Sequence, residues 1–542
     1  MKFAGADILA VEENGEMIFK YWAIYSDRLQ TGTSPATFIK AAEHIGGYLY
    51  FYDLKKGFSY LQKYTIERNI YLRILESSST LYSVKGVGYE MRSLKNYTTK
   101  TKSEIIDEYA MTARKGAQSR ERYSLEDLRK QTENAAQAVR NAAKHHIETI
   151  KEVLKNAGAK TSARYLFARL TNSSIAFRAF RELSEYDNIC RRVSLGEYKH
   201  FREAYRGGYV FARPGTYHNI RSIDKNKMYT SYYRDYPLPY GNPIACNSFE
   251  ELERYKFYIC GVYMRFELKE GALPYITIRE ARHGVVNLEE SSGGEYVRLT
   301  LSNIDLDIIK RLYDVDIIFQ WGFGFYTSAG IFRKYADTFL QMLDKVKDKK
   351  EKEVIKLFLN MPTGRLGMNA ETEHIKYREE NGIIKPFIDS IEEQEERFNY
   401  FPMGIALTAY GRREILETGE KVGFDKIVYI DTDCIKYKGE ELPPGVEIDR
   451  HKLGAYKDEG TADIIKILTP KRYCTYQDET LSFKYSGYPH ADLKKAVRDG
   501  EKMSRAEAES IIEKLGEGDK IPITIETRIK GGYTKRTIYK GL

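Results

Sequence analysis

The chain has few cysteines for its 542 residues, and they lie far apart. The five are Cys190, Cys246, Cys260, Cys434 and Cys474, and none belongs to a Cys-x-x-Cys pair or to another zinc-binding spacing. Their odd number argues against a disulfide framework. We therefore expect neither structural zinc nor a disulfide scaffold, and we expect a reducing, cytoplasmic compartment.

Long apolar runs and a strong charge of one sign are also missing. No apolar run approaches the roughly 18 residues needed to span a bilayer, and no signal-peptide core follows Met1. Lys and Arg number 86 against 77 Asp and Glu, a net charge of +9. This mild charge permits a nucleic-acid partner only if it is localised. We expect a soluble protein without a membrane partner, long enough for several domains.

Alternating patterns indicate mixed α/β and α+β domains. The first ~100 residues combine helical patches with short β-forming runs at 7–11, 17–25 and 48–52, as an α/β domain would. Residues 101–160 are charged and alanine-rich at helical spacing, which predicts one long helix or two. Strand and turn residues dominate from about 205 to 330. We therefore expect a domain boundary near 185–200.

The stretch YIDTDC (429–434) places two carboxylates two residues apart in an apolar, β-forming run. Strand side chains repeat with period two, so Asp431 and Asp433 would share a face, where like charges repel unless a proton or cation intervenes. One interpretation is a hairpin turn, since Asp and Thr are common turn formers. The other is a Mg²⁺ site, because hard cations bind carboxylate oxygens. A third carboxylate would favour the metal site.

Asp224, in SIDKNKMYTSYYRDYPLPYG (222–241), is the candidate third carboxylate, although a lone Asp is more often a turn or capping residue. Lys352 and Lys356 lie four apart on a predicted helix, so they share one face, where two ammonium groups could hold a triphosphate. An ordinary solvated helix face is the more common explanation of such a pair when it is taken alone.

The order of these features resembles that of family B DNA polymerases. Asp224 with Tyr229 resembles motif A, KLFLNMPTGRLG (356–367) resembles motif B, YIDTDC resembles motif C and TPKRYCTY (469–476) resembles the Lys-x-Tyr motif. AYRGGY (204–209) looks like the Tyr-x-Gly-Gly motif. RFELKEGALPYITI and SSGGEYVRLTLSNIDL (291–306) look like the insertion of the protein-primed branch, which serves bacteriophages and linear plasmids.

The resemblance implies a two-metal phosphoryl-transfer site holding two Mg²⁺ ions, with Mn²⁺ as a substitute. Asp224 and Asp433 would bridge the metals, with Asp431 beside them. Tyr229 would be the steric gate under the deoxyribose. The remaining implied roles are triphosphate and nucleotide binding by Lys352, Lys356 and Asn360, template binding by Tyr205, Arg206, Gly207 and Gly208, and primer binding by Lys471 and Tyr473.

The implied fold is an N-terminal ribonuclease H-like exonuclease domain followed by a right-hand palm, fingers and thumb polymerase domain. The exonuclease-like domain would span 1–190 and the polymerase domain 191–542. Within the latter we expect a palm at about 191–330 and 403–480 with a first insertion at about 245–330, fingers at about 331–368, a second insertion hairpin around Asn381-Gly382 at about 369–402, and a thumb at about 481–542. The implied partners are a DNA template and primer, dNTPs and a terminal protein. We expect the protein to be a monomer and, if a phage encodes it, to act in the host cytoplasm.

The N-terminal domain departs from the exonuclease pattern. GADILAVEE places Leu9 two residues after Asp7, where the family has Glu, and YFYDLKKGFSYL places Asp53 where the family has Asn. LEDLRKQTENAA places Lys130 and Asn134 where Tyr and Asp are expected. We therefore expect a retained fold and single-strand channel without proofreading. The alternative is a divergent site regrouped from Asp7, Glu12, Glu13 and Asp53.

Motif B departs as well, because Thr363 replaces the tyrosine that packs on the nascent base pair. Pro362 removes a helix donor, so we expect the helix to end early. Two functions remain open. The first is a templated, protein-primed DNA polymerase, and the second is a specialised nucleotidyl transferase or a non-catalytic scaffold that binds nucleic acid or terminal protein.

Overall fold

The computed structural model describes most of the chain in sixteen stretches. These are residues 3–13, 16–68, 70, 72–76, 81–97, 102–109, 124–161, 171–191, 193–278, 288–368, 371–380, 383–393, 399–485, 498–515, 520–529 and 532–541. The predicted turn residues Asn381 and Gly382 lie outside them. Strands flank this position and pair antiparallel, β16 (Glu371–Glu380) with β17 (Ile383–Glu393), which agrees with the predicted hairpin.

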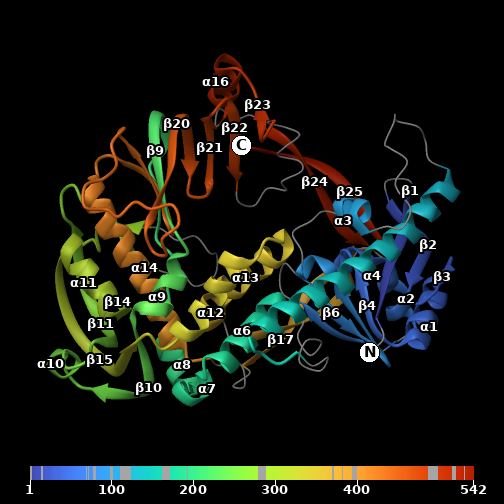
Figure 1. Cartoon of the computed structure of the whole chain (residues 1–542), viewed down its shortest axis with the longest axis horizontal. Helices are drawn as coiled ribbons and strands as arrows, with labels where there is room; N and C mark the ends of the chain where they lie inside the picture. The colour runs from blue at the N-terminus through green and yellow to red at the C-terminus, as the bar shows by residue number, and fades with distance from the viewer. Residues whose placement is uncertain are drawn as a thin grey trace.

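The N-terminal part is a mixed sheet covered by helices, drawn in blue in Figure 1. Its central strands run β2-β1-β4-β7-β6-β5, and β1 pairs parallel with β4 and β4 with β7. The predicted β-runs at 7–11, 17–25 and 48–52 fall in β1, β2 and β4. The strands are β1 (Phe3–Glu13), β2 (Glu16–Tyr25), β3 (Leu29–Gly32), β4 (Gly47–Phe51), β5 (Arg73–Glu76), β6 (Leu81–Lys85) and β7 (Tyr89–Ser93), and the helices are α1 (Pro35–Ile45) and α2 (Leu54–Glu67).

The alanine-rich region forms two helices, α3 (Lys102–Tyr109) and α4 (Leu125–Asn156). Ser124 caps α4 in a capping box with Asp127, which satisfies free backbone donors at the first turn. Small side chains on one face of α4 are buried against the sheet, so the helix lies close to it: Ala135, Ala136, Ala138, Ala142 and Ala143. Four shorter segments lead on from it, namely α6 (Asn172–Leu183), α7 (Tyr186–Ile189), α8 (Leu195–Arg202) and β8 (Val210–Ala212).

The C-terminal part is built on an antiparallel sheet with the strand order β23-β22-β21-β20-β9-β19-β18-β8. Its central strand β9 (Gly215–Lys225) pairs with β19 (Cys434–Lys438) on one side and β20 (Tyr456–Thr469) on the other. The remaining members are β18 (Ile427–Asp431), β21 (Arg472–Gln477), β22 (Thr480–Tyr485) and β23 (Glu501–Lys502), with α16 (Arg505–Lys514) beside β21. Strand β9 is thus paired with two strands that lie about two hundred residues later in the sequence.

A second, four-stranded sheet has the order β10-β15-β11-β14. Its strands are β10 (Pro237–Cys246), β11 (Phe257–Leu268), β14 (Val297–Ser302) and β15 (Tyr313–Ala329), and it is accompanied by α10 (Phe249–Leu252), α11 (Asn303–Leu312) and the short pair β12 (Ile276–Thr277) and β13 (Leu288–Glu289). This sheet covers most of the range predicted for the first insertion.

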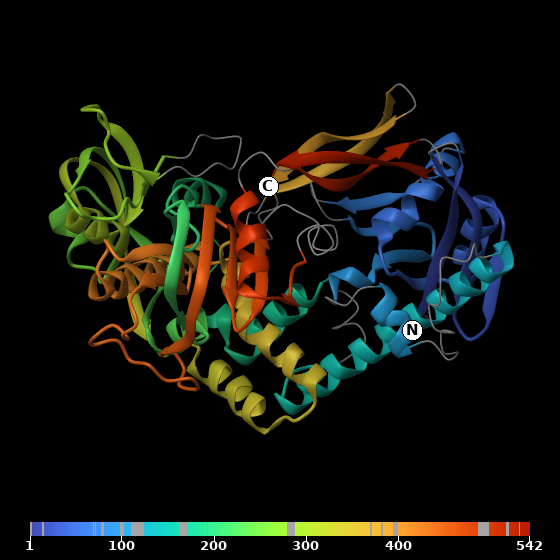
Figure 2. The same cartoon turned by 90° about the horizontal axis from the view of Figure 1, so that it is seen from above.

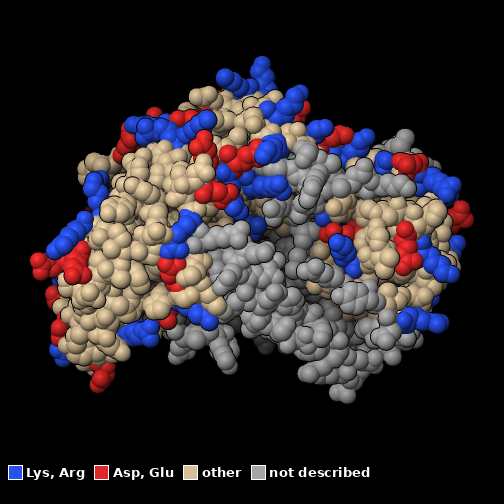
Figure 3. All heavy atoms as spheres, turned by 90° about the horizontal axis from the view of Figure 1, so that it is seen from below, with Lys and Arg blue, Asp and Glu red and all other residues tan. Residues whose placement is uncertain are grey.

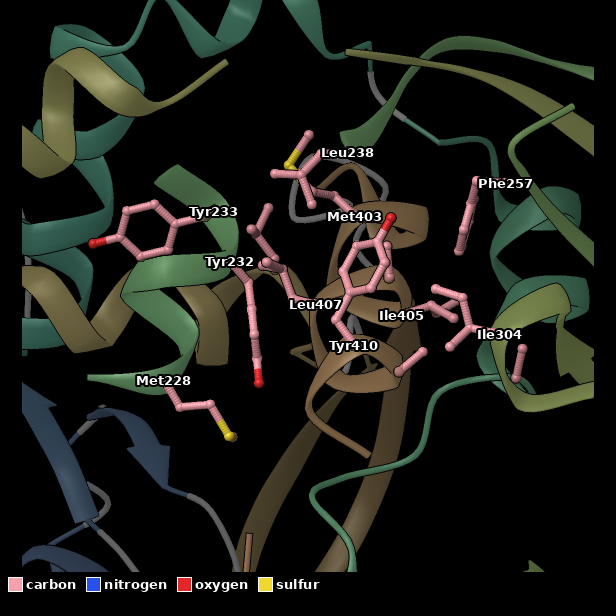
Figure 4. Close-up of a cluster of buried hydrophobic side chains, with 14 of the residues drawn as sticks. Met228, Tyr232, Tyr233, Leu238, Phe257, Ile304, Met403, Ile405, Leu407 and Tyr410 are labelled. Carbon is pink, nitrogen blue, oxygen red and sulfur yellow. The ribbon is translucent and has the colours of Figure 1, made fainter. Parts of the chain in front are cut away.

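Buried aromatic and aliphatic side chains join the helices to these sheets. Tyr232 on α9 (Met228–Asp235) lies beside Leu407 and Tyr410 of α14 (Phe401–Val422), whereas Tyr233 points away from α14, as Figure 4 shows. Burying a large apolar side chain contributes about 1.5–3 kcal/mol, so this cluster fixes α9 firmly against α14. Helix α9 begins four residues after Asp224, so this packing also positions the segment that carries that carboxylate.

The predicted early end of the helix at Pro362 is wrong. The region 331–368 forms two helices, α12 (Arg333–Lys345) and α13 (Lys349–Leu366), and Pro362 lies inside α13. Proline leaves the carbonyl four residues earlier without its helical donor. That carbonyl belongs to Phe358, and it accepts a hydrogen bond of 2.8 Å from the Tyr335 hydroxyl of α12. A side chain of the neighbouring helix therefore replaces the missing bond.

The last two strands, β24 (Lys520–Ile529) and β25 (Gly532–Gly541), pair with each other and return to the N-terminal sheet. β25 pairs with β2, and β24 meets β17, so one sheet of eleven strands contains both ends of the chain and the β16–β17 hairpin. Figure 2 shows the two hairpins side by side next to the blue domain. Lys350 of α13 also contacts the N-terminal part, 2.8 Å from the Tyr109 hydroxyl.

Candidate active site

The stretch 429–434 forms the tight turn of a β-hairpin. β18 ends at Asp431 and β19 begins at Cys434, which lies opposite Asp431. Thr432 adopts a φ of 62°, in the left-handed region that residues other than glycine rarely occupy. The amide of Asp433 donates to the carbonyl of Asp431 over 2.7 Å. The turn predicted from the sequence is confirmed, and it places the two carboxylates on either side of one residue.

Two segments from earlier in the chain hold this turn in place. The Thr432 amide donates to the Tyr209 carbonyl over 2.8 Å, and the Lys225 amide donates to the Asp433 carbonyl over 2.8 Å. A Cβ atom at Gly208 would lie 2.5 Å from Thr432 Oγ1, so a larger residue there would displace the turn. The glycine is therefore needed for close approach of the two backbones.

Asp224 is the penultimate residue of β9 and lies next to the hairpin. It lies opposite Cys434 in the pairing of β9 with β19, and opposite Lys457 in the pairing with β20. Burial and, to a smaller extent, the nearby carboxylates of Asp433 and Glu459 together raise the pKa of Asp224 to about 6, against the opposite effect of Lys457. The sheet thus brings Asp224 and Asp433 close enough for their charges to interact.

Glu459 is a fourth carboxylate that sequence reasoning missed. Ligand atoms of Asp224, Cys434 and Glu459 lie within 4.8 Å of one another, the one such group of three among the residues that the structure describes. The pairing of β20 with β9 shifts register between Asp458 and Gly460, so Glu459 is the extra residue of a bulge. The glycine inside a strand-forming run was the available signal.

The donor set fits a hard divalent cation. Asp224, Asp431, Asp433 and Glu459 offer carboxylate oxygens, which Mg²⁺ prefers. Burial raises the pKa of Asp433 as well, and Asp431 and Glu459 add to the effect. Burial raises the pKa of the Cys434 thiol, which keeps it protonated and unsuited to binding a hard metal. Repulsion among the carboxylates is the charge pattern that a bound cation relieves.

Lys471 forms an ion pair with one of these carboxylates. Its Nζ lies 2.9 Å from Asp431 Oδ1 and 3.1 Å from Oδ2. Its backbone amide donates to the Tyr429 hydroxyl, and the Tyr429 ring packs on Tyr473 with centroids 4.8 Å apart. The two residues predicted to hold the primer thus lie directly beside the hairpin turn.

The predicted template-binding segment packs against the same turn. Tyr205 contacts the ring of Phe401 with centroids 5.3 Å apart. Arg206 donates over 2.9 Å to the carbonyl of Thr300, and burial lowers its pKa. The carbonyls of Arg206 and Gly207 accept hydrogen bonds from Arg412 at 2.7 and 2.8 Å. The segment is therefore anchored by α14 as well as by the turn.

The predicted nucleotide-binding residues lie on α9 and α13. These two helices pack together, and the Tyr233 hydroxyl of α9 donates a 3.0 Å hydrogen bond to the Leu359 carbonyl of α13. Lys356 and Asn360 are exposed on α13, and Lys352 is half-buried one turn earlier. Burial raises the pKa of Tyr229 to about 12, and its ring lies edge-on to Tyr232. Thr363 is buried, and a threonine has no aromatic ring that could pack on a base pair.

Three of the positions compared with the exonuclease motifs, Asp7, Asp53 and Lys130, form ion pairs. Asp7 lies 2.6 Å from Lys102 Nζ, and Asp53 lies 2.6 Å from Lys95 Nζ. Leu9 packs with the apolar cluster of Tyr21, Ala23 and Ala136. Lys130 lies 3.3 Å from Glu126 on the exposed side of α4, and Asn134 is half-buried on the same helix. The side chains of Glu12 and Glu13 lie outside the described residues.

The raised pKa of Asp224 gives a stability prediction. Because folding raises this pKa from 3.8 to about 6, its contribution to stability is fully present below the unfolded value and is lost as pH rises through the folded value. In EDTA, Asp224→Asn should therefore raise Tm at about pH 8, and the gain should vanish below about pH 4. Calorimetry over this range is the measurement, and a gain that is independent of pH would contradict the assignment.

Charged side chains on the face shown in Figure 3 are intermixed, with Lys and Arg next to Asp and Glu over the described parts. The described parts of this face therefore do not form one broad basic patch. Within the described ranges, no helix is long and apolar enough to cross a membrane.

Comparison with known proteins gives consistent matches. A model of the family described as DNA polymerase type B, organellar and viral, matches residues 48–447. The DNA polymerase of Bacillus phage phi29 is 30% identical over 352 residues, 61% of this chain and 60% of that protein. The DNA polymerase of Streptococcus phage Cp-1 is 26% identical over 366 residues, 65% of this chain and 61% of that protein. Each match spans less than two thirds of the relative.

Solved structures share the fold. Phi29 DNA polymerase complexed with primer-template DNA and incoming nucleotides superposes with a TM-score of 0.81 at 21% identity, over 100% of this chain and 99% of that chain. Its orthorhombic crystal form gives a TM-score of 0.82 at 22% identity over the same shares. The predicted fold class, an exonuclease-like domain followed by a right-hand polymerase domain, is confirmed. With the family match covering residues 48–447, the chain belongs to the organellar and viral family of type B DNA polymerases.

Proposed function

We propose that this protein is a template-directed DNA polymerase that adds deoxynucleotides by two-metal phosphoryl transfer. The observation that carries the proposal is the convergence of Asp224 with the Asp431–Asp433 turn, beside a cavity lined by Lys356 and Asn360 of α13. Carboxylates that collect divalent cations, next to basic groups that bind phosphates, are the two parts that this chemistry needs.

The residues have distinct roles in this proposal. Asp224 and Asp433, with Asp431 and Glu459 beside them, would hold two Mg²⁺ or Mn²⁺ ions, which lower the pKa of the primer hydroxyl and stabilise the leaving pyrophosphate. Lys352, Lys356 and Asn360 bind the incoming nucleotide, and Tyr229 excludes a 2′-hydroxyl. Tyr205, Arg206, Gly207 and Gly208 position the template, and Lys471 and Tyr473 hold the primer terminus.

The domain assignments follow from these roles. The strands β8, β9, β18, β19, β20 and β21 form the palm with α14. Helices α12 and α13 form the fingers, and residues from 481 onward, which include most of β22 and all of β23, form the thumb. The four-stranded sheet and the β16–β17 hairpin are the two insertions of the protein-primed branch. We therefore propose a terminal protein as the natural primer of a viral or plasmid replicon, acting with a monomeric polymerase in the host cytoplasm.

Primer extension tests the function directly. The protein, Mg²⁺ and single dNTPs are added to a hairpin primer whose first template base is varied among the four. The expected result is extension only by the complementary nucleotide. Incorporation that ignores the template would favour the second candidate, an untemplated nucleotidyl transferase. One observation supports that candidate: Thr363, which is buried, replaces the tyrosine that packs on the nascent base pair in the family. No incorporation with any dNTP would favour a non-catalytic binding scaffold.

We further propose that the N-terminal domain lacks proofreading, because Leu9 and Asn134 offer no carboxylate where the family pattern has one. The carboxylates that remain, Asp7 and Asp53, each form an ion pair with a lysine. A 5′-labelled single-stranded DNA should keep its full length at high enzyme concentration in Mg²⁺ or Mn²⁺. Asp7→Ala is the matched control, since it distinguishes the protein's own activity from a contaminating nuclease. Shortening from the 3′ end that Asp7→Ala abolishes would overturn the proposal and favour the regrouped site.

A further inference from the structure

A cavity of about 230 Å³ lies between the beginning of α9 and the middle of α13. Four residues line it: Lys227, Lys356, Leu359 and Asn360. Lys356 and Asn360 come from α13 and already have a role in the proposed function. Lys227 comes from the opposite wall, three residues after Asp224, and nothing in the motif pattern assigns it a role.

The backbone of Lys227 is strained. It precedes α9 with φ 47° and ψ 48°, in the left-handed region, and its side chain makes no capping hydrogen bond to the helix. Left-handed backbone costs a residue with a Cβ atom roughly 1–2 kcal/mol, and Asn, Asp or Gly would serve better as the cap. A lysine at this position is therefore unfavourable for the fold, and such strain persists mainly where a side chain is needed for function.

The ammonium group of Lys227 lacks a partner in the described part of the chain. The side chain is half-buried, and no hydrogen bond or ion pair joins its Nζ to another described residue. Burial lowers its pKa, Asp344 acts in the opposite direction, and Lys356 lowers it further. Two cations thus repel each other across the cavity. An anion with several charges would relieve both the repulsion and the incomplete solvation.

We infer that Lys227 is a third phosphate-binding lysine, which contacts the triphosphate of the incoming nucleotide from the α9 side, opposite Lys356. The inference rests on the proposed polymerase function and deepens it. One short segment, 224–227, then carries both a metal-binding carboxylate and a phosphate-binding cation. A triphosphate bound between Lys227 and Lys356 bridges α9 and α13, so nucleotide binding draws the fingers and palm elements together.

Lys227→Asn removes the charge at low risk to folding, because asparagine tolerates the left-handed region better than lysine. In primer extension, this variant should raise the KM for dNTP by about tenfold to a hundredfold, the effect of losing a charge-assisted hydrogen bond, and change kcat less than about threefold. Lys227→Arg should stay within about threefold of the unmodified protein. Lys347→Asn, at an exposed lysine between α12 and α13, is the matched control and should change nothing.

Direct binding separates this inference from the polymerase proposal. Calorimetric titration with dATP or inorganic tripolyphosphate in Ca²⁺ should show about tenfold weaker binding to Lys227→Asn than to the unmodified protein or Lys227→Arg. If the unmodified protein binds dATP in this Lys227-dependent way but copies no template, the polymerase proposal fails and the inference stands. Equal binding by Lys227→Asn, or a loss in Lys227→Arg as large as in Lys227→Asn, would overturn the inference even if templated synthesis is robust.

Discussion

Asp433→Ala is expected to lower the rate of templated nucleotide incorporation by at least about a thousandfold, which corresponds to about 4 kcal/mol of transition-state stabilisation. Asp433 follows Thr432 at the turn, and its carbonyl accepts the Lys225 amide that follows Asp224. The side chain therefore lies at the turn between β18 and β19, next to the end of β9 that carries Asp224. Losing a carboxylate shared by two metal ions removes a ligand from both.

The measurement is single-nucleotide extension of the templated hairpin in Mg²⁺, with rates from rapid quench. Asp425→Asn is the matched control, since this exposed carboxylate lies two residues before β18 and outside the proposed metal set. It should retain full activity. Affinity for the primer-template, measured by gel shift without divalent cations, should change less than about threefold in Asp433→Ala, because the phosphate-binding cations remain.

Retained incorporation in Asp433→Ala would mean that the hairpin is not the metal site. Reduced incorporation accompanied by equally reduced DNA binding would mean that the variant has disturbed the turn. A thermal scan in EDTA decides whether the fold is intact. Burial raises the pKa of Asp433, so removing its charge should leave Tm unchanged or raise it at neutral pH.

The hairpin follows from a local pattern, whereas the pairing of Asp224 with the turn is implied by the resemblance to family B DNA polymerases. Period-two alternation with Asp-Thr-Asp predicts a turned strand pair, and the order of motifs predicts which distant carboxylate meets it. Glu459 is different, because its position depends on a bulge in the pairing of β20 with β9. The register of two strands is a property of both, and one strand's sequence does not specify it.

The error at Pro362 has a similar cause. Proline does remove a helical hydrogen bond, but whether the helix ends depends on what else reaches the free carbonyl. Here Tyr335 donates to the Phe358 carbonyl from another helix, and this contact forms only when α12 packs on α13. The eleven-stranded sheet is likewise non-local, since it pairs β2 with β25 across the length of the chain.

Arg412→Met is expected to destabilise the protein by about 3–5 kcal/mol, because it leaves a buried carboxylate without its counter-charge. Asp305 is fully buried, and Arg412 Nη2 lies 2.7 Å from its Oδ1. Burial alone would raise the pKa of Asp305, but Arg412 and Arg206 outweigh that effect and lower it, so the carboxylate remains charged. Ser302 and Tyr275 complete its hydrogen bonds.

Urea unfolding, with the midpoint and slope fitted together, measures this change. Arg413→Met is the matched control. Its guanidinium is about one third exposed and lies 3.9 Å from Glu417, so the expected loss is below about 1 kcal/mol. In Arg412→Met with Asp305→Leu, the uncompensated carboxylate is removed and only Arg206 loses a nearby counter-charge, so the double variant should recover most of the loss. Failure to recover would mean that the hydrogen bonds from Arg412 to backbone carbonyls dominate.

Those backbone bonds connect this buried pair to the active-site turn. Arg412 donates to the carbonyls of Arg206 and Gly207, and two residues later the Tyr209 carbonyl accepts the Thr432 amide between Asp431 and Asp433. The double variant regains stability without regaining these donors. We therefore expect it to fold well and yet extend primers about tenfold more slowly, the cost of one lost buried hydrogen bond at a positioning residue. Full activity in the stable double variant would limit Arg412 to a role in folding.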